Sequence, residues 1–447
     1  MEYTLLLFPK NRGNPMYIAE LYQIYQQYPV VCTDSRRCLS GSLFFALKGE
    51  LFDGNLFAEK ALQAGCAYAV VDNPAVRTDD RYIVVDDVLQ TLQQLACYHR
   101  QILKTPVISI TGTNGKTTTK ELLAAVLSAK YNVLYTSGNL NNHIGVPLTL
   151  LRLTPEHEIA VIEMGANHPG EIRDLAQIAR PDYGIITNVG YAHLEGFGSL
   201  EGVIRTKGEL YDYVRQTNGK IFIHKENTYL QSIAEGLEQI SYGESKDTFV
   251  SGRVDSSHPF LSFKWENDSV SYSVSTNLVG DYNLWNALAA IAVGLYFDVP
   301  VSDMNRAISE YMPTNNRSQW KKTLHNELII DAYNANPSSM QAALANFASL
   351  AVRPKAVILG DMLELGAESL QLHTVIVEKL NRYGFEKALL CGEQFATATF
   401  ITTHDSCQCF PNIETLNHYI STNPLRGYHI LIKGSHGIHL ENIIDLL

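Results

Sequence analysis

The chain has 447 residues, enough for about three domains of ordinary size. Apolar residues make up 46% and charged residues 18%, so every domain can bury a core and wholesale disorder is not expected. Lys and Arg number 35 against 46 Asp and Glu, a net charge of −11. This balance argues against a protein that coats nucleic acid, but small anions can still be bound locally.

Seven cysteines are spread along the chain without the paired spacing of a zinc site, so we expect free thiols in a reducing compartment. The apolar run at residues 3–8 lacks the basic flank of a signal peptide. The run at 287–297 is shorter than the about 18 residues of a membrane span. We therefore expect a cytoplasmic protein that starts at Met1 or at Met16 and does not enter a membrane.

The first two blocks are expected to be residues 1–103 and 104–312. The first mixes short elements, with a buried strand at 43–47 and a helix at 57–64. In the second, strands alternate with helices, which predicts a mostly parallel sheet. Its expected buried strands lie at 106–110, 159–162 and 184–187.

Residues 219–279 differ from the rest of the second block, because apolar and polar residues alternate on both sides of Asn267-Asp268. This alternation predicts an antiparallel hairpin appended to the sheet. A helix is expected from about Asn283 to Tyr296. The third block, 313–447, reads as a doubly wound, Rossmann-like α/β unit. Its expected strands lie at 328–330, 356–359, 388–390 and 430–432.

The sharpest local signal is Thr-Gly-Thr-Asn-Gly-Lys-Thr-Thr-Thr at 111–119, between an expected strand and an amphipathic helix. Glycines let backbone N–H groups turn around phosphates, and the helix N-terminus adds positive potential. Lys116 can reach the β- and γ-phosphates, and the Thr117 hydroxyl can bind Mg²⁺. Ile110 stands where the common phosphate loop has its first glycine, so the loop is a tighter variant and a generic kinase or GTPase is disfavoured.

Glu163 and His193 each follow the end of an expected strand in the second block. Carboxyl ends of parallel strands share one edge of a sheet, the edge at which such folds bind ligands. Mg²⁺ prefers hard oxygen ligands. We therefore expect Glu163 and His193 to join Thr117 as metal ligands. A helix cap for Glu163 and an ordinary polar contact for His193 are the alternatives.

The chain resembles the Mur ligase superfamily, ATP-dependent ligases that form amide bonds in peptidoglycan precursor synthesis. The resemblance covers the chain from about Cys32 to the C-terminus. Besides the loop, it rests on the segments 139–147, 163–172, 188–196, 207–209, 280–287, 331–337, 360–366 and 433–435. It implies an α/β protein with a small domain for a UDP substrate, a central phosphate-loop domain and a C-terminal Rossmann-like domain.

Two segments, 331–337 and 360–366, are most similar to the superfamily members that join D-alanyl-D-alanine to UDP-N-acetylmuramoyl-tripeptide. In these members the reaction passes through an acyl phosphate and yields ADP and phosphate. The alternative is a member that adds a single amino acid to a UDP-N-acetylmuramoyl-dipeptide. Nucleic acid is not an expected partner, and a monomer is expected.

The resemblance also implies roles for individual residues. Lys116, His193 and Lys207 are the expected catalytic residues, and Lys207 matches a position that the family carbamylates, which helps to order a second Mg²⁺. The expected ATP contacts are Gly112, Thr113, Asn114, Gly115, Lys116, Thr117, Thr118, Asn283, Asn286, Arg317 and Asp331. The expected substrate contacts are Ser35, Arg36, Lys48, Gly49, Asn141, Asn142, Asn334 and Asn336. Asn316 replaces the family's glycine before Arg317, which weakens that assignment.

Two other functional classes are weighed against a ligase. A phosphate-loop NTPase that does mechanical or regulatory work is disfavoured by the missing first glycine and by the pair Asn283 and Asn286, placed to read adenine. A binding module with an inactive site is disfavoured by the intact Lys116, Glu163 and Lys207. Because the ATP site draws on the second and third blocks, we expect the domains to close on binding.

Overall fold

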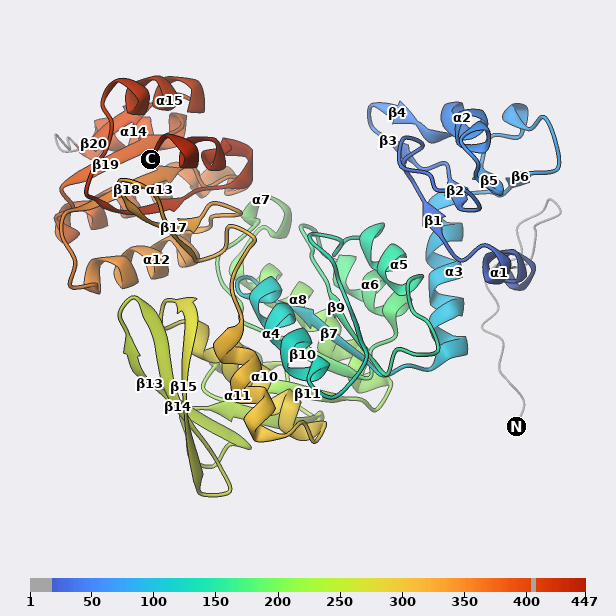
Figure 1. Ribbon diagram of the computed structural model, residues 1–447, viewed down its shortest axis with the longest axis horizontal. Helices are drawn as coiled ribbons and strands as arrows, with labels where there is room; N and C mark the ends of the chain where they lie inside the picture. Colours follow the sequence, from blue (N-terminus) through green and yellow to red (C-terminus); the bar gives the residue numbers. More distant parts are fainter. Residues whose placement is uncertain (1–17, 403–406) are drawn as a thin grey trace. The chain divides into compact units, whose positions relative to one another are not determined.

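The structure is a computed structural model that describes residues 18–402 and 407–447 (Figure 1). The apolar run at 3–8 and the alternative start at Met16 therefore lie outside the described residues. The chain divides into two compact units. The first comprises residues up to 107 with 134–162 and 174–180, and the second comprises 108–133, 163–173 and 181–447.

The first unit contains a four-stranded parallel sheet with the strand order β1-β2-β5-β6. Its strands are β1 (Val31–Cys32), β2 (Leu43–Phe45), β5 (Tyr68–Val71) and β6 (Tyr82–Val84), with a small hairpin of β3 (Lys48–Gly49) and β4 (Phe52–Asp53). The unit also holds α1 (Ile18–Gln27), α2 (Ala58–Gln63), α3 (Val88–Leu103), α5 (Gly145–Leu150), most of α6 (Glu171–Ala179), and the neighbouring strands β8 (Val133–Tyr135) and β9 (Ile159–Glu163).

Local chemistry sets the limits of these elements. Helix α3 begins after Asp87, whose carboxylate accepts the N–H of Gln90 at 2.7 Å, and it ends at Lys104 in a left-handed conformation. Helix α2 buries Ala58 and Ala61 against Phe44 of β2, which gives this small sheet its core.

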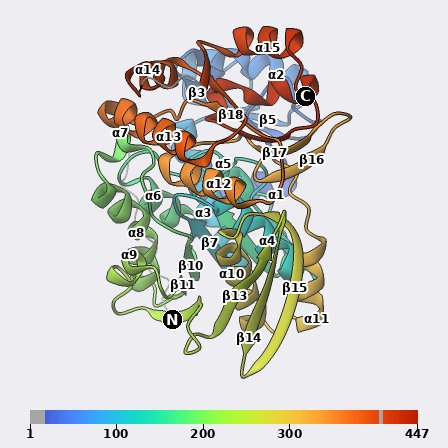
Figure 2. The ribbon, with the colours of Figure 1, turned by 90° about the vertical axis from the view of Figure 1, so that its left-hand side faces the viewer.

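The second unit begins with seven strands in the order β15-β14-β13-β12-β11-β10-β7. Their bounds are β7 (Val107–Thr111), β10 (Tyr183–Ile186), β11 (Lys220–His224), β12 (Glu238–Gly243), β13 (Val250–Ser257), β14 (Phe260–Asn267) and β15 (Val270–Val279). The strands β7, β10, β11, β12 and β13 pair in parallel, whereas β13, β14 and β15 pair antiparallel. The predicted hairpin of β14 and β15 is confirmed. The pattern missed β13 as its third antiparallel strand, because half of β13 is exposed and mostly polar. The three strands lie side by side in Figure 2.

Helices of the second unit cover this sheet. The helices are α4 (Lys116–Ser128), α7 (Leu194–Phe197), α8 (Leu200–Gln216), α9 (Thr228–Ser232), α10 (Asn283–Tyr296) and α11 (Val301–Glu310). The predicted helix at 283–296 is confirmed as α10, and its residues are buried along most of its length because it packs against α4 and several strands. Helix α8 packs on the other side, against β10 and β11.

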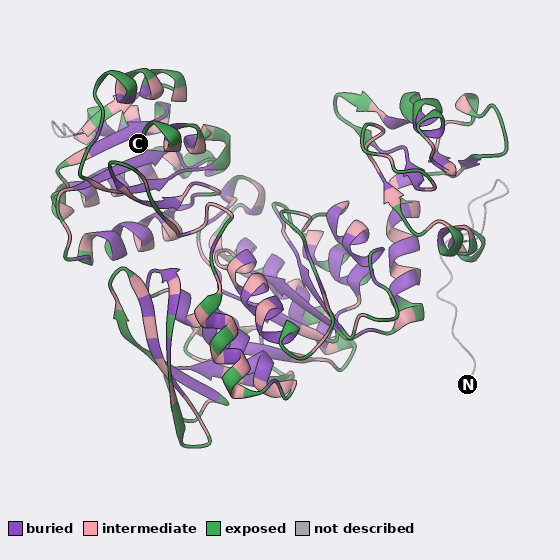
Figure 3. Cartoon of the chain, in the orientation of Figure 1, coloured by how far each residue is buried: buried purple, intermediate pink, exposed green. Residues whose placement is uncertain are grey.

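A second sheet, of six strands in the order β16-β17-β21-β18-β19-β20, ends the chain. Its elements are β16 (Gln319–Lys322), β17 (Glu327–Asp331), α12 (Pro337–Ser349), β18 (Lys355–Gly360), α13 (Ser369–Tyr383), β19 (Lys387–Cys391), α14 (Glu393–Thr402), β20 (Cys407–Phe410), α15 (Ile413–Thr422) and β21 (His429–Lys433). All pairs are parallel except β16 with β17. Separate hydrophobic clusters cover the two faces, as a doubly wound unit requires (Figure 3).

The α/β class, the mostly parallel sheets and the C-terminal doubly wound unit are confirmed. The edge strands β16 and β20 were missed, because an edge strand needs few apolar residues. Among the described residues no helix is long and apolar enough to cross a membrane. All seven cysteines are free thiols, as expected.

Candidate functional site

The loop between β7 and α4 depends on two glycines. Gly112 has φ +140°, and a Cβ atom there would lie 2.1 Å from Oγ1 of Thr187. Gly115 has φ +79°, and a Cβ atom there would lie 2.6 Å from Oδ1 of Asn286. Both the left-handed backbone and the close approach of neighbouring groups therefore require glycine.

The segment that follows β10 holds this loop in place. The N–H of Thr113 donates to the carbonyl of Asn188 at 2.9 Å, and the N–H of Asn114 donates to Oδ1 of Asn188 at 3.0 Å. The Thr187 hydroxyl donates to the carbonyl of Asn114 at 2.6 Å. These two loop N–H groups therefore already have acceptors within the protein. The N–H groups of the first turn of α4 have no intrahelical acceptor, so they are the ones suited to bind phosphate.

Lys116 is the first residue of α4, and its side chain turns back onto the loop. Its Nζ donates to the carbonyls of Gly112 and Thr113 at 2.7 and 3.1 Å. The pKa of Lys116 is lowered to about 8, mainly by burial; the charge of Glu163 opposes this shift, and the charge of Arg317 adds to it. The ammonium is thus a poorly solvated cation beside the phosphate-binding N–H groups.

Thr117 and Glu163 are both buried, and the Thr117 hydroxyl donates to Oε1 of Glu163 at 3.2 Å. A hydroxyl and a carboxylate side by side are hard oxygen donors, and they fit Mg²⁺. The structure thus brings together two of the three residues that were predicted to bind the metal. Within the described ranges, no cluster of three or more His, Cys, Asp or Glu side chains is suited to hold a metal by itself.

His193, the third predicted metal ligand, precedes α7 and has φ +50°. Its Nδ1 forms a short hydrogen bond with Oε2 of Glu364, from the loop after β18. This contact with His193 lowers the pKa of Glu364. The contact engages Nδ1, so Nε2 is the ring nitrogen suited to a metal.

Lys207 lies in α8 and is buried, and its Nζ donates to the carbonyl of Ala166 at 3.3 Å. The ammonium also lies 5.1 Å from the centre of the Phe197 ring. Burial is the main cause that holds the pKa of Lys207 well below its ordinary value, and the charge of Lys116 adds to it. The environment therefore favours the neutral amine.

Asn283 and Asn286 lie beneath the phosphate loop on α10. The side-chain amide of Asn286 donates to Oδ1 of Asn283 at 2.8 Å and accepts from the Thr119 hydroxyl at 3.0 Å. The amide of Asn283 donates to the carbonyl of Val279 at 2.8 Å. Asn286 thus lies against the loop and Asn283 holds Asn286, and the predicted contact of both residues with adenine stays a prediction.

Arg317 stacks on the ring of Tyr333, with Cζ 3.8 Å from the ring centre. The preceding Asn316 has φ +54°, a left-handed conformation that glycine favours and asparagine tolerates. The replacement of the family's glycine is therefore compatible with the local backbone.

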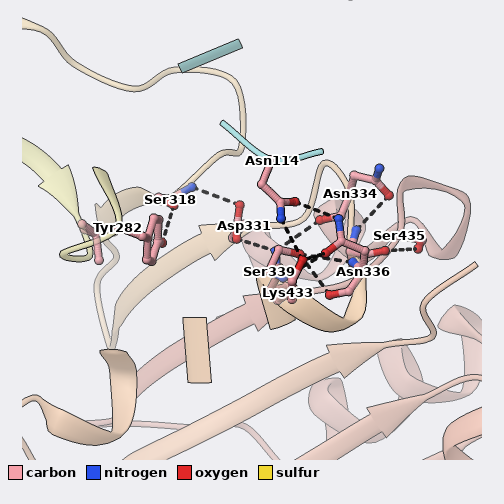
Figure 4. A network of polar contacts seen from close by, with 12 residues as sticks. Asn114, Tyr282, Ser318, Asp331, Asn334, Asn336, Ser339, Lys433 and Ser435 are labelled. Carbon is pink, nitrogen blue, oxygen red and sulfur yellow. Dashed lines mark hydrogen bonds and ion pairs between the residues drawn. The ribbon is translucent and has the colours of Figure 1, made fainter. Parts of the chain in front are cut away.

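Asp331 is held on both sides in the third block (Figure 4). Its Oδ2 pairs with Nζ of the buried Lys433 at 2.5 Å, and its Oδ1 accepts the N–H of Ser318 at 3.3 Å. The Ser318 hydroxyl lies 2.8 Å from the hydroxyl of Tyr282. The carboxylate is thereby fixed at the carboxyl end of β17.

Asn336 and Asn334 differ in their surroundings (Figure 4). Asn336 is buried, caps α12, and donates from Nδ2 to Oδ1 of Asn114 at 2.8 Å. Asn334 is exposed, and its Oδ1 accepts the N–H of Ala335 at 2.8 Å. Asn336 thus caps a helix and contacts the phosphate loop, and the predicted contacts of both residues with substrate stay predictions.

The remaining predicted substrate residues belong to the first unit. Arg36 makes two hydrogen bonds to Asp34, at 2.9 and 2.8 Å, and they lower the pKa of Asp34 to about 2. Nζ of Lys48 lies 2.9 Å from Oδ1 of Asp72. A Cβ atom on Gly49 would lie 2.5 Å from the Phe52 ring. Ser35 lies in the turn after β1, Asn141 lies in the loop before α5, and Asn142 accepts the N–H of Gly145 at 2.8 Å.

Three polar residues of the sequence motifs have contacts that the sequence pattern did not predict. Asn188 holds the phosphate loop, Glu364 contacts His193, and Lys433 neutralises Asp331. Asn188 and Glu364 stand in Gly-containing segments after strands, and Lys433 ends β21 just before Gly434; this position is a signal for a site. The partner of each side chain lies too far away in the sequence to be inferred from spacing.

Three protein-family models together span most of the chain. The model described as Mur ligase family, catalytic domain, matches residues 27–100. The Mur ligase middle domain matches 110–294, and the Mur ligase, glutamate ligase domain, matches 316–436.

Full-length relatives agree with these models. The chain is 37% identical to the UDP-N-acetylmuramoyl-tripeptide–D-alanyl-D-alanine ligase of Bacillus subtilis and 34% identical to that of Escherichia coli, each time over 93% of both chains. A crystal structure of MurF from Acinetobacter baumannii matches with a TM-score of 0.84 and 31% identity, over 95% of this chain and 97% of that one.

Proposed function

Because the chain belongs to the Mur ligase family, we propose that it joins D-alanyl-D-alanine to UDP-N-acetylmuramoyl-tripeptide at the expense of ATP. It is an acid–amino-acid ligase of peptidoglycan precursor synthesis, and it forms ADP. The observation that carries this function is the match to ligases of that name at 34 to 37% identity over 93% of the chain. The phosphate loop, which lies beside Glu163, the half-buried Lys116 and the buried Lys207, agrees with this function.

The first chemical step transfers the γ-phosphoryl group of ATP. A carboxylate oxygen of the tripeptide attacks γ-phosphorus, the bond to the bridging oxygen breaks, and ADP leaves. Both reactants are anions, so charge neutralisation is the main task of the protein. Lys116 and the N–H groups of the first turn of α4 supply it, and losing one such preorganised group costs about 3 kcal/mol.

Thr117, Glu163 and His193 would hold Mg²⁺ at this step. The ion supplies charge neutralisation at the phosphates when it is bound. Glu364 keeps the ring of His193 oriented through Nδ1, so that Nε2 is the nitrogen available for the metal.

Lys207 acts as a carbamate in this proposal. Its neutral amine forms a bond to the carbon of CO₂, a proton leaves to solvent, and the side chain becomes an anion. Two observations support the reaction: the side chain is buried, and its pKa lies well below the ordinary value, so the nucleophilic amine is populated. An anion at this position helps to order a second Mg²⁺, which an ammonium would repel.

The second step forms the amide. The amine of D-alanyl-D-alanine attacks the acyl phosphate, and the tetrahedral intermediate releases phosphate. Asn334 and Asn336 are proposed to lie near the nucleotide or the dipeptide. Ser35, Arg36, Lys48, Gly49, Asn141 and Asn142 are proposed to contact the UDP-linked substrate. We place the enzyme in the cytoplasm as a monomer, with domain boundaries near 103 and 312.

The decisive experiment measures phosphate release with ATP, Mg²⁺ and UDP-N-acetylmuramoyl-tripeptide, together with either D-alanyl-D-alanine or free diaminopimelate. We expect release and a product of the corresponding mass only with the dipeptide. A parallel reaction with UDP-N-acetylmuramoyl-dipeptide and diaminopimelate tests the single-amino-acid ligase. Activity in that reaction alone would overturn the proposal.

A Lys116→Met variant is the control for the assay, because it keeps the length of the side chain and removes its charge. Phosphate release that persists in this variant, or that is independent of both amines, would come from another ATPase. Release that depends on the dipeptide and is lost in Lys116→Met would assign the activity to this chain.

A further inference from the structure

Three side chains form a closed ring of hydrogen bonds between the phosphate loop and the third block, and Figure 4 shows two of them, Asn114 and Asn336. Asn336 Nδ2 donates to Asn114 Oδ1 at 2.8 Å, and Asn114 Nδ2 donates to the Ser338 hydroxyl oxygen at 2.9 Å. The Ser338 hydroxyl donates in turn to Asn336 Oδ1 at 2.8 Å. Each group donates once and accepts once within the ring, so the orientation of both amides is determined.

Asn114 connects two parts of the second unit. Its main chain is bound to the segment after β10, through the Asn188 side chain and the Thr187 hydroxyl. Its side chain is bound only to the start of α12 in the contacts that the structure records for it. Asn114 immediately precedes Gly115 and Lys116, so displacement of α12 would act directly on the residues that bind phosphate.

A second contact lies beside the ring. A Cβ atom on Gly190 would lie 3.2 Å from the Ser338 hydroxyl oxygen, which is closer than most such contacts. The N–H of Gly190 donates to the Thr113 hydroxyl at 3.0 Å. Ser338 therefore packs against the same segment that holds the loop, and the start of α12 fits there closely.

We propose that Asn336 and Ser338 are positioning residues that set the conformation of the phosphate loop through Asn114. In this role the docking of α12 makes the loop competent for ATP, and the amide of Asn336 acts on the loop through Asn114. The proposal rests on the proposed function for its consequence in catalysis. Its structural part, the dependence of the loop on α12, can be measured without any substrate.

Two substitutions test the ring with little effect on α12 itself. Ser338→Ala removes two of the three hydrogen bonds and leaves the cap of α12 intact. Asn336→Ser keeps a hydroxyl that can cap the helix, but a serine side chain is too short to reach Asn114.

Each substitution has a matched control in the same block. Ser339→Ala removes a hydroxyl from the next residue, which contacts Asn336 but not Asn114. Asn412→Ser changes the cap of α15, where Asn412 accepts the N–H of Thr415 at 3.0 Å.

The first measurement is hydrogen–deuterium exchange of the peptide that covers 112–119 in the ligand-free protein. We expect Ser338→Ala and Asn336→Ser to speed its exchange by about tenfold, since each loses at least one hydrogen bond, and the controls to leave it unchanged. Unchanged loop exchange in both variants would overturn the proposal, whether or not the protein is a ligase.

The second measurement separates positioning from general stability. We expect Ser338→Ala to raise the KM for ATP about tenfold at an unchanged melting temperature. In a double-mutant cycle, Asn114→Ala combined with Ser338→Ala should weaken ATP binding no more than Asn114→Ala alone. Additive losses in this cycle would also overturn the proposal. Absence of ligase activity in the wild-type chain would instead count against the proposed function.

Discussion

Two lysines at the site, Lys116 and Lys207, lie close enough together that the charge of Lys116 lowers the pKa of Lys207. Burial lowers the pKa of both, but their neighbours differ. Lys116 has Glu163 nearby and donates to two carbonyls, whereas Lys207 has a single carbonyl acceptor and an aromatic ring. Two lysines can thus have different tasks, one as a cation for phosphate and one as a neutral amine.

The pKa of Lys116 predicts how ATP affinity changes with pH. Bound phosphates favour the ammonium, so the pKa of Lys116 is higher in the complex than its value of about 8 in the free protein. Below pH about 8, Lys116 is charged both in the free protein and in the complex, so the affinity for ATP does not change with pH. Above that pH, binding must take up a proton, so affinity falls by up to about tenfold per pH unit. Calorimetry with a non-hydrolysable ATP analogue at pH about 7 and about 9 measures this fall.

Lys116→Met is the control for this titration. It should bind the analogue more weakly and show no further loss between the two pH values. Equal affinity of the wild-type protein at both would contradict the assignment of Lys116 as a cation for phosphate.

Carbamylation of Lys207 can be detected directly. We expect a carbamate carbon resonance after incubation with ¹³C-labelled bicarbonate, absent in Lys207→Ala, and a loss of kcat of about 100-fold in that variant. Lys120 is the matched control, because it is also fully buried but pairs with Glu121 at 2.7 Å. A resonance that persists in Lys207→Ala, or disappears in Lys120→Met, would argue against the site.

At the scale of elements, the βα turn from β7 to α4 is supported from three sides. The segment after β10 holds its main chain, α10 lies beneath it, and the start of α12 contacts Asn114. Glycine is needed where these elements come closest. The loop conformation therefore depends on the packing of several elements as well as on its own sequence.

Gly115→Ala tests the contact between this loop and α10. A left-handed alanine costs about 1 kcal/mol, and its Cβ would lie 2.6 Å from Oδ1 of Asn286. Gly384→Ala is the control, since Gly384 has φ +61° and no atom within 4 Å of its would-be Cβ. Both variants should lose a similar amount of stability from the backbone, and only Gly115→Ala should also lose ATP affinity, by about tenfold. The idea fails if the two variants bind ATP equally well.

At the scale of the whole molecule, a protein of net charge −11 binds two anionic substrates. The cations and N–H groups proposed to neutralise phosphate are local to the second unit, while the residues predicted for the UDP end are in the first. The net charge of the protein therefore does not predict the charge of its ligands. Buried charges at the site are screened far less by salt than charges on the surface.

We predict that the domains close on binding, because the residues predicted to bind ATP come from the second and third blocks. An acyl phosphate is sensitive to water, and closure would exclude water from it during the reaction. Small-angle scattering should show a smaller radius of gyration with a non-hydrolysable ATP analogue plus UDP-N-acetylmuramoyl-tripeptide than with either alone. An unchanged radius would contradict closure.

The sequence alone was sufficient for the features that depend on neighbouring residues. The glycine-rich loop, the helix at 283–296, the hairpin of β14 and β15 and the four inner strands of the last sheet all follow from local periodicity and turn chemistry. The proximity of Thr117 and Glu163 also followed, because the carboxyl ends of parallel strands meet at one edge.

Only the tertiary structure decided how side chains distant in sequence meet. His193 meets Glu364, Asp331 meets Lys433, and Asn336 meets Asn114, across more than 100 residues in each case. The same holds for the left-handed Asn316 and for the depressed pKa of Lys207, since backbone strain and burial depend on what surrounds a residue. Local sequence encodes elements, whereas the partners, charges and proton affinities of a site arise from packing between them.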